Sequence, residues 1–267
     1  MKKSTFIPSL TKTLQSILLL CGLTAAAQAA IITPTFDEFV PLPSATWGGS
    51  GIPNDAVAIS RFRNFTLGLS AHGRYNNSPL SNNGAGTFYA EPGKNTPQGS
   101  ILEGALWNFN FYVNFPSLDN LASSGNPDGY VFELFYDFNP NSDNSKSTHG
   151  VLNLNQLSTT GLKDWKFVEQ IDNGILTYTL QGSQNLNFNF LSNNGNPTFI
   201  TPPSGQSFDA NANGIYTFAL TASVNNEEKA RSAIRVEVGT NSVPVPAPAT
   251  IALLAGGLVL LQLRKRK

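Results

Sequence analysis

Short stretches of alternating apolar and polar residues fill the middle of the chain, which is the pattern of β-strands. The clearest is WNFNFYVNF at 107–115, where large apolar residues occupy every second position and asparagines fill most of the others. A period of two places successive side chains on opposite faces, so we expect a strand with one buried face. The same alternation recurs at 151–155 and 185–191. The stretch 130–138 is more continuously apolar and predicts a central strand.

Turn residues separate these stretches from further candidate strands. Asp172-Asn173-Gly174 predicts a tight hairpin, because Asx residues and glycine tolerate the positive φ that such turns need. The other short strands are predicted at 56–62, 65–69, 87–90, 167–171, 175–180, 214–222 and 233–238. Strands at this spacing, with almost no helical periodicity, indicate an all-β fold. We expect one jelly-roll-like antiparallel β-sandwich over 30–242, with an irregular lead-in at 41–54.

The end of the chain, 243–267, has three consecutive parts. A proline-rich hinge comes first, an uncharged apolar run follows it at 251–261, and four cations close the chain. These cations are Arg264, Lys265, Arg266 and Lys267. An apolar segment followed by a basic cluster is typical of a helix that stops with its charges on the cytoplasmic side. The uncharged stretch 249–263 has 15 residues, whereas a full span needs about 20, which favours temporary insertion.

The N-terminal end carries the features of an export signal. Three lysines flank the start of an apolar run at 17–23, and Ala-Gln-Ala at 27–29 forms a cleavage site. We therefore predict a signal peptide over 1–29, which signal peptidase removes. Cys21 is the single cysteine of the chain and lies in that peptide, so the mature protein has no disulfide.

The hinge region resembles the PEP-CTERM sorting signal of Gram-negative bacteria. That signal reads Val-Pro-Glu-Pro, then a small residue, a hydroxyl residue, a short apolar helix and an arginine-rich end. The matching positions here are Val245, Pro246, Ala247, Pro248, Ala249 and Thr250. Ala247 stands where the family has glutamate, which leaves open which sorting enzyme accepts this tag.

The resemblance implies a route through the cell envelope. An exosortase-like enzyme would cleave the tag after transient insertion in the inner membrane and deliver the protein to the cell surface or the extracellular space. In the family such proteins accompany exopolysaccharide and biofilm formation. An ordinary C-terminal anchor behind a proline-rich linker is the alternative interpretation of the same residues.

The charge of the mature region differs from that of the whole chain. Seven of the 17 lysines and arginines lie in the two terminal signals, whereas all 17 carboxylates lie between them, which leaves a net charge of −7. An acidic ectodomain argues against nucleic acid or an anionic membrane as a partner. It is compatible with polysaccharide and with divalent cations.

Two segments have oxygen-bearing side chains at alternate positions, as calcium loops do. The first is DANANG at 209–214, with Asp209, Asn211 and Asn213 as candidate ligands. It lacks the bidentate glutamate of an EF-hand, and Asx turns explain the same spacing. The second is DFNPNSD at 137–143, and its candidate ligands are Asp137, Asn139, Asn141 and Asp143. A polar loop leaving the sheet is the alternative for this segment.

Aromatic residues supply a candidate carbohydrate site. Trp47 lies in a glycine-rich segment and Trp165 beside charged residues, so we expect both rings to be exposed for stacking on sugars. A calcium-assisted carbohydrate-binding module is thus one alternative function, and a secreted hydrolase is another. Ser70 and His72 are the nearest approach to a nucleophile motif, and the closing glycine of that motif is missing. We expect no enzyme.

Overall fold

The computed structural model describes residues 32–63, 65–96, 103–116, 129–140, 145–157, 165–172, 175–192 and 198–239. The chain divides into two units, Met1–Ala30 and Ile31–Lys267, and all of these residues belong to the second. Within the described ranges, no helix combines the length and apolar character needed to cross a membrane.

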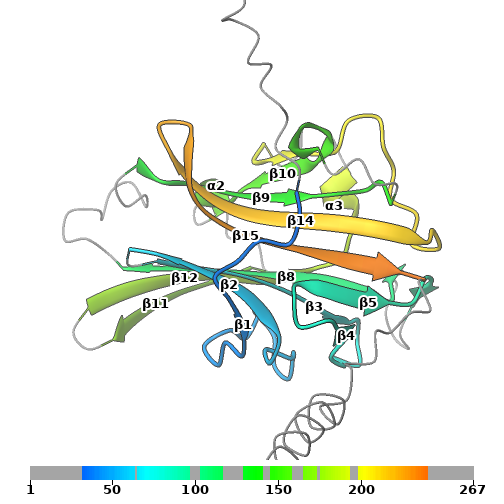
Figure 1. Ribbon diagram of the computed structural model, residues 1–267, viewed down its shortest axis with the longest axis horizontal. Helices are drawn as coiled ribbons and strands as arrows, with labels where there is room; N and C mark the ends of the chain where they lie inside the picture. The colour runs from blue at the N-terminus through cyan, green and yellow to red at the C-terminus, as the bar shows by residue number, and fades with distance from the viewer. Residues whose placement is uncertain are drawn as a thin grey trace, which may run out of the picture. The chain divides into compact units, whose positions relative to one another are not determined.

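These residues form two large sheets and one small one (Figure 1). The six-stranded sheet has the order β1 (Glu38–Val40), β2 (Val57–Phe62), β3 (Phe65–Gly73), β8 (Trp107–Pro116), β12 (Ile175–Gln184) and β11 (Trp165–Asp172). The seven-stranded sheet has the order β13 (Ile200–Thr201), β10 (Gly150–Asn153), β9 (Val131–Tyr136), β14 (Gly214–Val224), β15 (Glu227–Val238), β5 (Thr87–Ala90) and β4 (Ser81–Asn82). The small sheet pairs β6 (Lys94–Asn95) with β7 (Gly104–Ala105).

Helical structure in this part of the chain is limited to single turns. They are α2 (Leu154–Leu157), α3 (Asn189–Ser192) and the 3₁₀ helix η2 (Lys146–Thr148). The strand pairs are antiparallel except for β15 and β5, which run parallel. The prediction of an all-β fold is therefore confirmed, and the parallel pair is a departure from the all-antiparallel pattern that we expected.

The two large sheets contribute to one hydrophobic core. On β8 the apolar residues at every second position all belong to it, as the alternation predicted. The ring of Phe109 stacks on Phe218 of β14 at 4.6 Å between centroids. Hydrogen bonds also link the sheets, because Ser232 of β15 donates to the Ala58 carbonyl of β2 at 2.7 Å, and Ser60 of β2 donates to the Arg231 carbonyl.

The opposite face of β8 is buried as well, which the sequence did not predict. Asn110 has no exposed surface, and Tyr112 joins a second hydrophobic cluster with Trp47 and Leu42. The lead-in segment 41–54 forms no strand and instead covers this outer face. The predicted strand at 107–115 is therefore confirmed with its apolar face in the core. Its other face is more buried than we expected at Asn110 and Tyr112, whereas Asn108 and Asn114 keep intermediate exposure.

Two hairpins differ in how well their turns were anticipated. The predicted hairpin at Asp172–Gly174 is confirmed by the register of β11 and β12, in which Asp172 pairs with Ile175. The hairpin between β14 and β15 was missed. Its turn residues Asn225 and Asn226 have φ of 52° and 63°, as a two-residue hairpin loop requires. Consequently β15 begins at Glu227, earlier than we expected.

The predicted strand at 185–191 is wrong. β12 ends at Gln184, and a turn leads into the single-turn helix α3. Asn185 causes the break, since its side-chain oxygen accepts a hydrogen bond from the backbone nitrogen of Asn187 at 3.1 Å. This Asx turn offers the backbone an alternative to the strand ladder.

Candidate functional site

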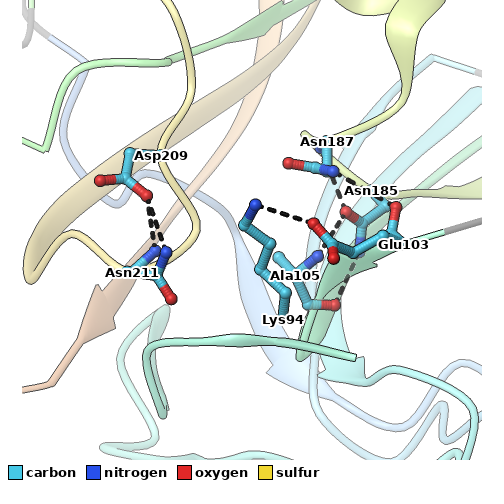
Figure 2. A network of polar contacts seen from close by, with 7 residues as sticks. All are labelled: Lys94, Glu103, Ala105, Asn185, Asn187, Asp209 and Asn211. Carbon is cyan, nitrogen blue, oxygen red and sulfur yellow. Dashed lines mark hydrogen bonds and ion pairs between the residues drawn. The ribbon is translucent and has the colours of Figure 1, made fainter. Parts of the chain in front are cut away.

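A polar network joins four stretches of the chain near the small sheet (Figure 2). We call it the Lys94 cluster; its members are Lys94, Glu103, Asn185, Asn187, Asp209 and Asn211. Lys94 lies on β6, Glu103 directly precedes β7, the asparagines at 185 and 187 follow β12, and the remaining two precede β14. A backbone hydrogen bond of 2.7 Å from Gly93 to the Ala210 carbonyl holds the first and last stretches together.

Asn185 is the buried centre of the cluster. Its side-chain nitrogen donates to the carbonyls of Ala105 and Trp107, at 3.0 and 2.8 Å, and its oxygen accepts from the Ala105 nitrogen at 3.0 Å. The amide thus pairs with the β7–β8 backbone as a neighbouring strand would. Asn187 adds a bond of 3.2 Å from its side-chain nitrogen to the Glu103 carbonyl. These contacts fix the backbone that presents the charged members (Figure 2).

The charged members of the cluster lie at the surface. Lys94 Nζ is 2.7 Å from Glu103 Oε1, and both side chains are partly exposed. The hydrogen bond and the charge of Glu103 raise the pKa of Lys94, and the charge of Asp209 adds to this. An exposed ion pair contributes little to stability, so its main effect is to place two hydrogen-bonding groups side by side.

The two predicted calcium segments lie next to each other. The backbone nitrogen of Ile215, which follows the first, donates to the carbonyl of Pro140 in the second at 3.0 Å. The carboxylates of both segments act on Tyr216, whose pKa is raised by burial and then by the charges of Asp209 and Asp137. Sequence alone gave no reason to expect these segments to be neighbours.

In each segment one carboxylate oxygen takes part in an Asx turn. Asp209 Oδ1 accepts hydrogen bonds from the backbone and side-chain nitrogens of Asn211, at 2.9 and 3.2 Å. Asp137 Oδ1 accepts from the backbone nitrogen of Asn139 at 2.8 Å. Within the described ranges, no three His, Cys, Asp or Glu side chains are grouped to hold a metal ion. Asn141 and Asp143 lie outside those ranges, and calcium binding stays a prediction.

A buried contact between His149 and Thr217 was not predicted from the sequence. His149 Nε2 lies 2.7 Å from Thr217 Oγ1 and 4.0 Å from Asp137 Oδ2, while its Nδ1 lies 2.9 Å from the Ser145 carbonyl. If Nδ1 carries the ring proton, Nε2 accepts a hydrogen bond from the threonine hydroxyl. A histidine base beside a hydroxyl nucleophile has this arrangement. Thr217 is fully buried, however, so a substrate does not reach it.

The serine motif does not form a nucleophile elbow. Ser70 and His72 lie inside β3, and the Ser70 hydroxyl donates to the Ala56 carbonyl at 2.7 Å. An elbow needs a sharp strand-to-helix turn, and this backbone is extended. His72 is 1% exposed and its Nδ1 lies 2.9 Å from the Asn110 side-chain nitrogen. Burial lowers the pKa of His72 to about 4, so its imidazole is neutral at physiological pH.

Trp47 is in the core, and the prediction of an exposed ring is wrong. Its side chain is 1% exposed, packs edge-on against Tyr112 and donates from Nε1 to the Pro53 carbonyl at 2.9 Å. Its backbone nitrogen and that of Thr46 both donate to Gln181 Oε1. A tryptophan held in this way has no face left for a sugar. Trp165 lies on β11, and its side chain is outside what the structure describes.

The residues of the predicted sorting signal, Val245 to Thr250 and Arg264 to Lys267, lie outside the described ranges. The chain matches no known protein family, no curated protein and no solved structure at a significant level.

Proposed function

We propose that this chain is an exported cell-surface or extracellular-matrix protein that is sorted and trimmed through its C-terminal tag. Its signal peptide spans 1–29, its ectodomain spans 30–242, and its sorting signal spans 243–267. Signal peptidase processes the N-terminal end and an exosortase-like enzyme the C-terminal end. The processed protein is associated with exopolysaccharide.

The observation that carries the proposal is where the described strands begin and end. They run from Glu38 to Val238, and all of them fall within the predicted ectodomain. The last described strand, β15, ends at Val238, and the next residue, Gly239, has a φ of 73° and donates from its nitrogen to the Ala90 carbonyl at 3.0 Å. A tag that follows such an end can be removed with no loss of strand pairing among the described residues.

We further propose that the ectodomain is a jelly-roll-like β-sandwich. The support is the core cluster to which both large sheets contribute, together with the serine hydrogen bonds between β2 and β15. Such a core stabilises a region of this length without disulfides, and the mature chain has no cysteine. This fits an exported protein that folds outside the cytoplasm without oxidation.

Truncation tests the proposal. A chain that ends at Ser242 keeps every described strand and lacks the whole predicted tag. We expect it to be exported and folded but to miss the destination of the full-length chain, measured by immunoblots of periplasm, membrane and medium. A chain in which only the four terminal cations are replaced by glutamine is the matched control for membrane retention. Equal distribution of the truncated and full-length chains would contradict the proposal.

A further inference from the structure

Tyr75 presents an aromatic ring to solvent close to the Lys94 cluster. Its side chain is 45% exposed, and Val40 is the other large apolar residue exposed in the described part of the chain. Most aromatic rings described here are packed in the cores. Tyr75 lies two residues after the end of β3, and the intervening Arg74 donates from its backbone nitrogen to the Leu106 carbonyl at 2.8 Å.

The turn that carries Tyr75 is held in an uncommon conformation. The backbone of Tyr75 has φ of 65°, and that of Asn77 has 48°. For a bulky residue this conformation is strained and persists only where the surroundings enforce it. Here Gly73 donates to the Ser78 carbonyl at 2.8 Å, and Asn77 donates from its side chain to the Ser50 carbonyl at 3.2 Å. The ring is therefore held in place before any ligand arrives.

One face of the Tyr75 ring rests on a buried cation. The guanidinium carbon of Arg74 lies 4.2 Å from the ring centroid, and 5.6 Å from the ring of Phe188. Arg74 is 4% exposed, and loss of hydration lowers its pKa. A Cβ on Gly104 would overlap the guanidinium, so glycine at 104 makes the room for it. With one ring face covered by Arg74, the exposure of Tyr75 comes from the rest of the ring.

The segments that carry the charged groups pair with the segment that carries this ring. The backbone nitrogen of Arg74 donates to the Leu106 carbonyl at 2.8 Å, and that of Leu106 donates to the carbonyl of Gly93, next to Lys94, at 3.2 Å. Gly104, which touches Arg74, is adjacent in sequence to Glu103, and Glu103 is paired with Lys94. Asn187 and Phe188 bring the loop after β12 to the same place. A flat amphipathic ring beside a few fixed polar groups is the composition of sites that bind hydroxyl-rich ligands.

We propose that Tyr75 is the stacking platform of a saccharide site, with Lys94, Glu103 and Asn187 as its hydrogen-bonding partners. The ligand is a neutral pyranose unit of a polysaccharide, whose C–H face lies on the ring and whose hydroxyls reach the polar groups. Lys94 is neutralised by Glu103 and the mature region carries seven excess negative charges, so an anionic polysaccharide fits less well. This binding is independent of how the protein is sorted.

Affinity electrophoresis of the purified full-length chain in mild detergent tests the site. Native gels contain laminarin, dextran, xylan or galactomannan as neutral probes, and alginate as the anionic one. We expect at least one neutral polysaccharide to retard the wild-type chain. Replacement Tyr75→Ala is expected to weaken that retardation about tenfold, whereas Tyr75→Phe retains the ring and the binding.

Two further variants separate binding from folding. Tyr75→Gly suits the positive φ of this turn, so it keeps the fold while it removes the ring. Val40→Ala removes the other exposed apolar side chain and is expected to bind as the wild type does. The proposal is overturned if no gel that contains a neutral polysaccharide retards the chain, or if only the alginate gel does. It is also overturned if Tyr75→Gly is retarded like the wild type, or if Tyr75→Phe loses binding. Because the assay uses purified protein, each of these results leaves the sorting proposal untouched.

Discussion

The side-chain nitrogen of Asn110 lies 2.9 Å from Nδ1 of His72, and both residues are buried on the outer face of the six-stranded sheet. The asparagine donates this bond, so Nδ1 of the histidine has to remain without a proton. The neutral ring therefore carries its proton on Nε2, and a second proton on His72 places a charge where water has been excluded. Burial accordingly holds the pKa of His72 at about 4 instead of 6.5.

This pair makes stability depend on pH. Since the folded-state pKa of His72 lies below the unfolded one, the unfolded chain binds the extra proton between pH 6.5 and 4. We expect the contribution of His72 to be fully present above pH 6.5 and lost as the pH falls through this window. The loss by pH 4.5 is about 2.5 kcal/mol. Urea unfolding of wild type and His72→Asn, at pH 7 and at pH 4.5, measures it, and an equal pH effect in both chains would refute this assignment.

Asn185 is expected to matter more for stability than its exposed neighbour. Replacement Asn185→Ala leaves the buried nitrogen and carbonyl of Ala105 without their partner, so we expect a loss of about 3 kcal/mol. Asn187→Ala removes one exposed hydrogen bond and is expected to change stability by at most about 0.5 kcal/mol. Chemical denaturation of both variants measures the difference. Comparable losses in the two would show that Asn185 does not hold the β7–β8 backbone.

The contact between Gly104 and Arg74 predicts a coupling between two positions. A methyl group at 104 would overlap the guanidinium, so Gly104→Ala is expected to destabilise the fold by about 1–3 kcal/mol. In a chain that already carries Arg74→Ala the space is free, and the same change is expected to be near neutral. A double-mutant cycle by thermal or urea unfolding checks this. Additive effects would mean that the two residues do not share that space.

Replacement of Trp47 tests whether the segment 41–54 packs on the outer face of the six-stranded sheet. Its replacement by alanine removes a fully buried ring from the second hydrophobic cluster, and we expect a loss of about 3–5 kcal/mol. Val40→Ala, at an exposed position, is the comparison and is expected to cost less than about 0.5 kcal/mol. Urea unfolding curves of the two variants give both values. A Trp47→Ala chain as stable as the Val40→Ala chain would mean that the segment 41–54 does not pack as described.

Local patterns in the sequence predicted where the strands lie better than they predicted which distant residues contact them. Alternation located β8, turn chemistry located the β11–β12 hairpin, and the strand at 87–90 has the bounds that were expected. These features depend on neighbouring residues, because side-chain alternation and tight turns are set within a few positions. The strand predicted at 185–191 was wrong because alternation does not reveal what the Asn185 side chain bonds to, which is the nearby backbone of Asn187 and the backbone of Ala105, about 80 positions away.

The candidate site could not be assembled from the sequence. Its polar cluster joins residues near 94, 103, 187 and 209, and no local pattern links them. The residues around Tyr75 do not indicate that its ring is exposed. Trp47 lies in a glycine-rich segment that predicted an exposed ring, and it is buried. Whether an aromatic ring faces solvent depends on which distant segment it packs against, and Trp47 packs against Tyr112 of β8.

We propose that the final residues of this chain are a sorting tag that is removed after export. Intact-mass spectrometry of the protein recovered from the surface or medium of its own cells tests it most directly. We expect a chain that begins near Ala30 and has been cut close to Pro246–Pro248, so that the terminal Arg-Lys-Arg-Lys is absent. An exported chain that still carries Arg264 to Lys267 would contradict the account.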